Sequence, residues 1–109
     1  MKIEKKKDAS QQSCLILIGG EAVYDFVAEF REALLPELNE CRILIVDMSE
    51  VREIDLAFIQ LLSSAYKTAL IKKIKFTIKG KKRSIAMKRI EDSFLFSSEK
   101  KKTGVQNAG

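Results

Sequence analysis

The stretch from residue 43 to residue 68, ILIVDMSEVREIDLAFIQLLSSAYKT, constrains the fold more than any other part of the 109-residue chain. It begins with residues 43–46, four consecutive apolar residues of which three are β-branched. A run without polar residues is typical of a strand that is buried on both faces of a parallel sheet, between layers of helices. We therefore expect a central parallel strand here.

The residues after this strand predict a polar turn and then a helix. Asp47 closes the strand, and residues 49–53 supply the turn. From residue 56 the apolar side chains recur at helical spacing, which predicts a helix over residues 56–70. Asp55 stands directly before this helix and is a favoured N-cap, because its carboxylate accepts hydrogen bonds from the free amides of the first turn.

Strands and helices are also predicted before this stretch. The lysine-rich residues 2–6 could form a short edge strand, where lysines discourage pairing with another molecule. Residues 14–18 (CLILI) predict a second buried strand that ends at a glycine pair. Residues 21–35 predict an amphipathic helix that kinks or stops before Pro36, because proline lacks the amide donor that a helix interior needs.

The chain after the middle helix predicts one more strand and one more helix. Apolar and polar residues alternate over residues 74–79, which indicates a strand with one solvated face at an edge of the sheet. A third helix is predicted over residues 84–94, with Ser84 as its N-cap. Residues 97–109 have no apolar period, and we expect a disordered tail.

The alternation of these elements predicts a single α/β domain over residues 1–96, with a mostly parallel four- to five-stranded sheet flanked by helices. The length suits one small domain. No apolar run approaches the ~20 residues that cross a bilayer, and the first residues lack a signal peptide. We therefore expect a cytoplasmic protein, either a monomer or a weak dimer.

The composition excludes several classes of enzyme. The chain has no histidine and two cysteines, which removes the usual zinc sites and the Ser/His and Cys/His nucleophile pairs. Cys14 and Cys41 are expected to be reduced, partly buried thiols. Asp47 and Asp55 could form a carboxylate pair, but a turn role and a cap role explain them better. The sequence predicts no catalysis, no cofactor and no metal.

The charge is distributed unevenly along the chain. Residues 19–55 contain ten acids and three arginines, whereas residues 56–90 contain ten bases and no acid. Either two solvated surfaces differ in sign by chance, or the charges steer partners. Without interleaved aromatics or a recognition helix, nucleic acid is not an expected partner, and an acidic protein or anionic lipid headgroups suit the charge better. The densest basic patch is Lys79, Lys81, Lys82 and Arg83.

The order of residues 43–62 resembles that of the STAS domain, the fold shared by anti-sigma factor antagonists and the cytoplasmic tails of sulfate transporters. Family members typically carry a hydrophobic strand that ends in Asp, a turn, and an Asp-Ser-Ser-Gly or Asp-Thr-Ala-Gly tetrad that opens a helix. Here residues 55–58 (DLAF) occupy the tetrad position, and residues 59–62 (IQLL) continue the likeness. The resemblance extends over about residues 14–94.

In anti-sigma factor antagonists the second serine of the tetrad is phosphorylated by a partner kinase, and the added charge breaks the complex. The resemblance places that serine at Ala57 and the first hydroxyl residue at Leu56, and neither residue has a hydroxyl. Phe58 replaces the glycine. The usual switch is therefore expected to be missing, and Ser49 in the predicted turn is the alternative phosphosite that we would test.

The family binds partners through this helix and the turn before it. If exposed, Leu56 and Phe58 would be apolar anchors of such an interface. Both could instead fill the core, which is the favoured interpretation for Phe58 and an open one for Leu56. The exposed ridge of the helix would follow from residue 60 to residue 67. The resemblance thus implies a partner-binding set of Asp55, Leu56, Ala57, Phe58, Gln60 and Ser64.

These expectations point to a bacterial, stand-alone regulatory module that binds a protein such as an anti-sigma factor or a histidine-kinase-like ATPase. One alternative is an accessory subunit of a membrane transport complex of the phospholipid ABC type, which would bind a transporter ATPase and contact the membrane only through that complex. Another alternative is a domain that binds a small ligand, either a nucleotide or a lipid.

Overall fold

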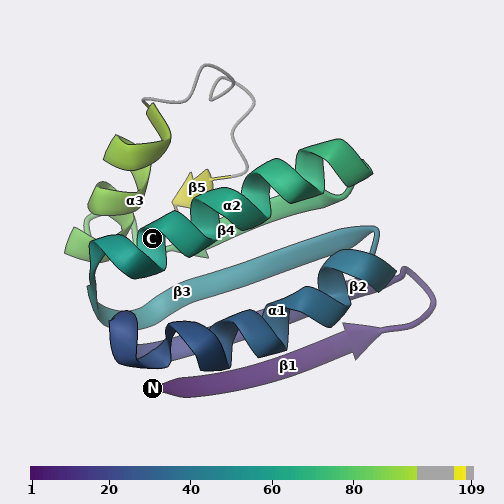
Figure 1. Ribbon diagram of the computed structural model, residues 1–109, viewed down its shortest axis with the longest axis horizontal. Coiled ribbons are helices and arrows are strands. Elements are labelled where there is room, and N and C mark those ends of the chain that lie inside the picture. Colours follow the sequence, from purple (N-terminus) through teal and green to yellow (C-terminus); the bar gives the residue numbers. More distant parts are fainter. Residues whose placement is uncertain (96–104, 108–109) are drawn as a thin grey trace.

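The computed structural model describes residues 1–95 and 105–107, and it shows a five-stranded sheet with helices packed against it (Figure 1). The strands lie side by side in chain order: β1 (Lys2–Asp8), β2 (Ser13–Ala22), β3 (Ile43–Ile54), β4 (Lys75–Gly80) and β5 (Val105–Asn107). The described helices are a 3-10 turn η1 (Tyr24–Phe26), then α1 (Val27–Glu40), α2 (Leu56–Lys72) and α3 (Ile85–Leu95).

The sheet is mostly parallel, as the sequence predicts. β1 runs antiparallel to β2 and forms one edge of the sheet, whereas β2, β3, β4 and β5 are parallel to one another. The predicted α/β class and the lysine-rich edge strand are therefore confirmed. In the described part of the chain, no helix combines the length and the apolar character needed to cross a membrane.

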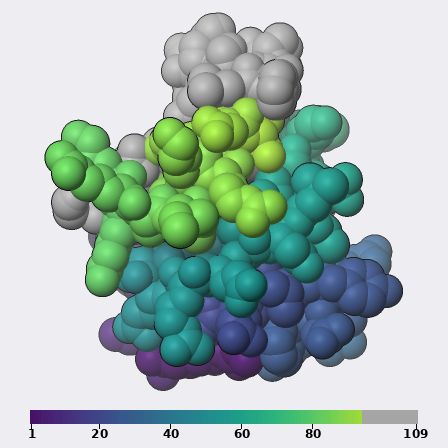
Figure 2. All heavy atoms as spheres, turned by 90° about the vertical axis from the view of Figure 1, so that its left-hand side faces the viewer, coloured from purple at the N-terminus to yellow at the C-terminus, as the bar shows by residue number. Residues whose placement is uncertain are grey.

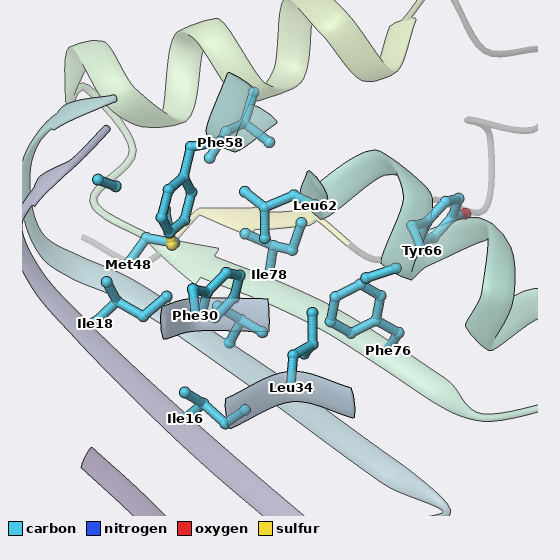
Figure 3. Packing of buried hydrophobic residues seen from close by; sticks show 14 of the residues in the cluster. Ile16, Ile18, Phe30, Leu34, Met48, Phe58, Leu62, Tyr66, Phe76 and Ile78 are labelled. Atoms are coloured by element: carbon cyan, nitrogen blue, oxygen red, sulfur yellow. The ribbon is translucent and has the colours of Figure 1, made fainter. Parts of the chain in front are cut away.

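The helices that the structure describes cover one face of the sheet. Side chains from α1 and α2 point toward the strands (Figure 3), and an added Cβ at Gly80 in β4 would meet the side chain of Met87 from α3. On this face β2 and β3 contribute fully buried residues. The core residues labelled in Figure 3 are Ile16, Ile18, Phe30, Leu34, Met48, Phe58, Leu62, Tyr66, Phe76 and Ile78.

The expectation that β2 and β3 are buried on both faces is wrong. Their alternate residues, among them Leu15, Leu17, Ile43 and Ile45, are only partly buried and lie on the face away from the helices. Leu15 pairs with Ile45 across the two strands, so these aliphatic side chains shield one another. Mutual shielding along a sheet face produces the same apolar run as a covering layer of helices, and the sequence cannot distinguish the two.

Both long strands continue past the predicted turns. β3 runs to Ile54, so the predicted polar turn at residues 49–53 is strand. β2 likewise runs through Gly19 to Ala22. The register shifts twice where these halves pair, as at a β-bulge, and a Cβ on Gly19 would lie 3.2 Å from Cβ of Glu50. Backbone pairing with a neighbouring strand stabilises this polar stretch, which side-chain periodicity does not reveal.

Pro36 lies inside α1, so the helix does not stop before the proline, which was one of the two predicted outcomes. The carbonyl that loses its amide partner is that of residue 32, and both positions are exposed to solvent. The residues on either side of the proline, Leu34, Glu37 and Leu38, are buried against the sheet. Tertiary packing of this face therefore outweighs the missing hydrogen bond.

The last elements match the prediction in part. Ser84 accepts a hydrogen bond from the amide of Met87 at 3.1 Å, as expected for the N-cap of α3. β4 is not an edge strand, because residues 105–107 of the predicted tail form β5 beside it, and Thr77 on its predicted solvated face is buried. Three residues can pair with β4 through backbone hydrogen bonds without any alternation of apolar side chains, so the sequence did not reveal β5. The rest of the predicted tail lies outside the described residues.

Candidate functional site

Asp55 joins two loops at the carboxyl ends of β2 and β3. Its Oδ1 accepts a hydrogen bond from the amide of Phe58 at 3.0 Å, which makes it the N-cap of α2 as predicted. Its Oδ2 accepts a second bond from the amide of Tyr24 at 2.8 Å. The amide of Asp55 also donates to the carbonyl of Ala22 at 3.2 Å. One carboxylate thus fixes the beginning of α2 against the η1 turn.

Two large apolar side chains lie exposed beside this carboxylate. Leu56 follows Asp55 and is 59% exposed, and Tyr24 is 71% exposed. The sequence identified Leu56 as a candidate interface residue but not Tyr24. Tyr24 was expected inside the helix predicted over residues 21–35, whereas α1 begins only at Val27. An aromatic residue outside the apolar stripe of that predicted helix was the available signal. Because the same carboxylate binds the backbone beside both residues, their relative position is fixed.

Phe58 cannot contact a partner in this structure. It is fully buried, and its ring stacks on Phe30 of α1 with centroids 4.9 Å apart. Phe58 therefore fills the core, the alternative that the sequence favoured, and it drops out of the exposed partner-binding set because residue 58 lies on the sheet-facing side of α2. Ala57 is partly exposed.

The exposed ridge of α2 continues from Leu56 through Gln60 and Ser64, both of which are exposed as predicted. Beside this ridge runs a groove between α1 and α2, with a volume of about 380 Å³. Arg31 and Leu35 of α1 line it opposite Leu61 and Ser64 of α2. The groove and the exposed ridge of α2 therefore share Ser64, while Leu56 lies outside the groove.

The basic patch lies at the same end of the sheet. Because β2, β3 and β4 are parallel, the segments that follow their carboxyl ends share one edge: η1, the beginning of α2 and the turn before α3. Figure 2 views this end of the molecule, with all three segments on it. Lys81, Lys82 and Arg83 are exposed there, and Lys79 is partly exposed in β4. We call this end the carboxyl rim.

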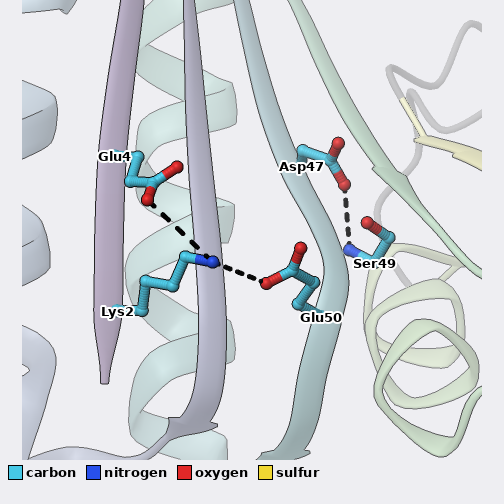
Figure 4. Close-up of polar contacts among 5 residues, drawn as sticks. All are labelled: Lys2, Glu4, Asp47, Ser49 and Glu50. Atoms are coloured by element: carbon cyan, nitrogen blue, oxygen red, sulfur yellow. Dashed lines mark hydrogen bonds and ion pairs between the residues drawn. The ribbon is translucent and has the colours of Figure 1, made fainter.

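Asp47 and Ser49 lie on the face of the sheet away from the helices. The amide of Ser49 donates to Oδ1 of Asp47 at 2.9 Å (Figure 4). Nearby, Lys2 of β1 binds Glu50 at 3.0 Å and Glu4 at 4.0 Å. Asp47 is thus in the middle of β3, while Asp55 follows its end, and the structure does not bring this carboxylate pair together. The acids around Ser49 would repel a phosphate there.

A second polar cluster, which sequence reasoning missed, lies at the opposite end of the sheet. Glu37 of α1 is only 1% exposed. Its Oε2 accepts from Lys5 at 2.7 Å and lies 3.2 Å from Nζ of Lys7, both on β1. Its Oε1 accepts from the thiol of Cys41 at 3.3 Å, and Cys14 of β2 lies beside them. The signal in the sequence was an acid on the apolar stripe of a helix.

Burial and neighbours shift the pKa values of this cluster. Burial raises the pKa of Glu37, but the hydrogen bonds from Lys5, Cys41 and Lys7 outweigh it, so the net pKa is lowered. Burial, together with the neighbouring Glu37 carboxylate, raises the pKa of the Cys41 thiol to about 12. Burial and the same carboxylate raise the pKa of Cys14. Both cysteines are free thiols, as predicted.

The sequence also matches a known family. A profile described as "Mlab, STAS domain" matches residues 6–90. The chain belongs to the STAS domain family. A search of curated protein sequences found no match.

Solved structures of other STAS proteins share the fold. The phosphorylated form of SpoIIAA, a Bacillus cell fate determinant, has a TM-score of 0.73 at 13% identity, covering 99% of this chain and 92% of its own. An anti-sigma factor antagonist from Mycobacterium paratuberculosis has a TM-score of 0.72 at 13% identity, covering 98% and 87%. A sulfate transporter family protein from Wolinella succinogenes has a TM-score of 0.60 at 13% identity, covering 84% and 73%.

Proposed function

We propose that this STAS domain is a non-catalytic regulatory module that binds a partner protein through the carboxyl rim. The observation that carries the proposal is the pair of exposed apolar side chains, Leu56 and Tyr24, whose backbones are fixed by the Asp55 carboxylate. STAS domains as a family are generally non-catalytic, and some of the structural matches are anti-sigma factor antagonists, which act on other proteins.

The arrangement of these residues suits an interface. Burying a leucine side chain is worth roughly 1.5–3 kcal/mol relative to leaving it exposed, and tyrosine is enriched among residues that dominate binding energies. Because Asp55 already fixes the backbone beside both residues, this domain would lose little backbone conformational entropy when a partner binds there. The groove between α1 and α2 offers adjoining surface for the same partner.

Charge supports the choice of a protein partner. The basic residues Lys81, Lys82 and Arg83 are exposed on the same rim as the apolar pair. They would attract an acidic surface and raise the rate of association, an effect that falls as salt screens the charges. An acidic protein surface that also carries an apolar pocket matches both features.

We propose further that phosphorylation at the beginning of α2 does not switch this interaction. Leu56 and Ala57 occupy the positions at which the family's tetrad carries hydroxyl residues, and neither can accept a phosphate. Incubation with an anti-sigma kinase of the cognate type should leave residues 55–58 unmodified. Phosphate found on this segment by mass spectrometry would refute the alignment of the tetrad.

The interface can be tested with two substitutions on one helix. Leu56→Asp places a charge in the proposed interface, whereas Ile71→Asp places the same charge near the other end of α2, where the side chain is 82% exposed. Pull-down from lysate of the source cell should recover a partner with wild type and with Ile71→Asp, and not with Leu56→Asp. Equal recovery with both variants, when both are folded by circular dichroism, would contradict the proposal.

A second candidate is a subunit of a membrane transport complex. The matching profile carries the description Mlab, and one structural match is the STAS domain of a SulP transporter from Vibrio cholerae. In this function the same rim would bind the ATPase or cytoplasmic surface of a transporter. Identification of the recovered partner separates the two: an anti-sigma factor or histidine-kinase-like ATPase supports the first, and an ABC-type ATPase supports the second.

A further inference from the structure

The cluster at the end of the sheet opposite the carboxyl rim contains three groups that can bind a metal. The Sγ atoms of Cys14 and Cys41 and a carboxylate oxygen of Glu37 all lie within 4.8 Å of one another. They come from β2, from α1 and from the residue directly after α1, so the fold itself brings them together. We propose that Cys14, Glu37 and Cys41 form a binding site for a thiophilic divalent cation such as Zn²⁺.

The spacing of the three atoms fits a single ion. Zn²⁺ binds thiolate sulfur at about 2.3 Å and carboxylate oxygen at about 2.0–2.2 Å in tetrahedral geometry, which puts neighbouring ligand atoms roughly 3.5–3.8 Å apart. Sγ of Cys41 and Oε1 of Glu37 are already 3.3 Å apart, and the remaining pairs have to close by at most about 1.3 Å. Cys41 is partly exposed and can rotate, whereas Cys14 and Glu37 are buried and fixed.

The surrounding lysines orient the carboxylate. Lys5 and Lys7 both bind Oε2 of Glu37, while Oε1 points to the thiol of Cys41. A metal ligand held on its other atom by a second group is the usual arrangement around protein metal sites. The oxygen that faces the sulfur atoms is therefore the one left to bind an ion.

The charge of the buried site also permits a cation. When Zn²⁺ binds, two S–H bonds break, two S–Zn bonds form, and two protons leave to solvent. The ion brings two positive charges and the departing protons remove two, so the net charge of the cluster with Glu37, Lys5 and Lys7 does not change. No new uncompensated charge is buried. The fourth position of the ion would be filled by a water molecule that enters past Cys41.

The composition makes the site easy to test. The two cysteines are the only ones in the chain and there is no histidine, so an untagged protein offers no other thiolate or imidazole ligand. The full-length protein, reduced and freed of metal, is titrated with Co²⁺, which gives sulfur-to-cobalt charge-transfer absorption on binding thiolates. We expect the near-ultraviolet absorbance to saturate at one Co²⁺ per chain and to disappear when Zn²⁺ displaces the cobalt.

Substitutions locate the ion. Cys41→Ser should abolish most of the charge-transfer band, and Glu37→Gln should weaken Co²⁺ binding by about tenfold or more. Glu40→Gln removes an exposed carboxylate three residues away on the same helix and should leave the affinity within about twofold. Because Cys41 is partly exposed, its substitution should keep the fold even if that of Glu37 does not.

Three results would overturn the proposal: no charge-transfer band in a protein with two titratable thiols, an unchanged band in Cys41→Ser, or a band that always requires two chains per metal. The site lies at the other end of the sheet from Leu56 and does not depend on the proposed partner. Loss of metal binding and loss of partner binding are therefore separate outcomes.

Discussion

Two carboxylates, Asp55 and Glu37, join segments at opposite ends of the same sheet, and they do so with different chemistry. Asp55 is partly exposed and accepts from two backbone amides, those of Phe58 and Tyr24. Glu37 is buried and accepts from side chains, two ammonium groups of β1 and the thiol of Cys41. The Asp55 carboxylate fixes the backbone beside exposed apolar residues, and the Glu37 carboxylate holds the edge strand β1 against α1.

Together with the proposed interface, the difference predicts how stability and partner binding would divide between the two ends of the sheet. Backbone donors fix the path of the chain whatever the neighbouring side chains are, so residues beside Asp55 are free to serve a partner. Side-chain donors around a buried carboxylate instead make each residue of the cluster depend on the others. We therefore expect substitutions at the Glu37 end to act mainly on stability, and substitutions at the Asp55 end to act mainly on binding.

The largest effect on stability should come from Glu37→Gln. The amide keeps the shape but loses the charge that attracts Lys5 and Lys7, and hydrogen bonds to charged groups contribute roughly 1.5–3 kcal/mol. We expect the free energy of unfolding of the metal-free protein to fall by about 2–3 kcal/mol in urea denaturation. Glu40→Gln, on the exposed face of the same helix, should change it by less than about 0.5 kcal/mol. If both variants lower the free energy of unfolding equally, the Glu37 carboxylate does not hold β1 against α1.

Asp55→Ala should have the next largest effect. Loss of an N-cap costs about 0.5–2 kcal/mol, and here the bond to the amide of Tyr24 is lost as well. Asp55→Asn separates the two hydrogen bonds, because its single carbonyl oxygen can cap Phe58 while its NH2 group cannot accept from the amide of Tyr24. We expect Asn to recover the cap but not the bond to Tyr24, so its stability and partner binding, measured on the same preparations, should lie between those of wild type and Ala. If Asn equals wild type, the bond between Asp55 and Tyr24 does not fix the rim.

The contacts of Asp55 and those of Glu37 also differ in how well the sequence predicts them. Asp55 and Ser84 were identified as N-caps because a cap is a local signal, one polar residue before an apolar period. The two lysine partners of Glu37 on β1 are 32 and 30 residues away in the sequence, and no local pattern encodes those contacts. Nothing in the order of residues 1–12 indicates that Lys5 and Lys7 face a buried acid.

Backbone pairing accounts for the other errors. The polar half of β3, the glycines of β2 and the three residues of β5 are strands because a neighbouring strand accepts and donates their ladder bonds. The side chains of these segments have no period that separates them from turns. Similarly, Phe58 is buried because it lies on the side of α2 that faces the sheet. Its position in the family's tetrad does not tell which side of the helix it occupies.

Lys5→Ala and Lys7→Ala should have smaller and unequal effects, which tests how the Glu37 end is built. Lys5 is the more buried of the two and lies closer to the carboxylate, 2.7 Å against 3.2 Å. Exposed ion pairs contribute little to stability, so Lys7→Ala should lower the free energy of unfolding less than Lys5→Ala does. Denaturant unfolding of both single variants and the double variant measures their coupling.

The smallest effect on stability, and the sharpest contrast with Glu37, should come from Leu56→Ser and Tyr24→Ser. Both side chains point into solvent, so their removal should change the free energy of unfolding by no more than about 0.5 kcal/mol. Partner binding should nevertheless fall with each, and the paired variant should lose less than the sum of the two losses if both residues enter one pocket. Calorimetry with the recovered partner gives these values. If the Leu56→Ser variant is clearly less stable but binds the partner normally, Leu56 acts as a core residue. The proposal that one end of the sheet serves binding and the other serves stability would then be wrong.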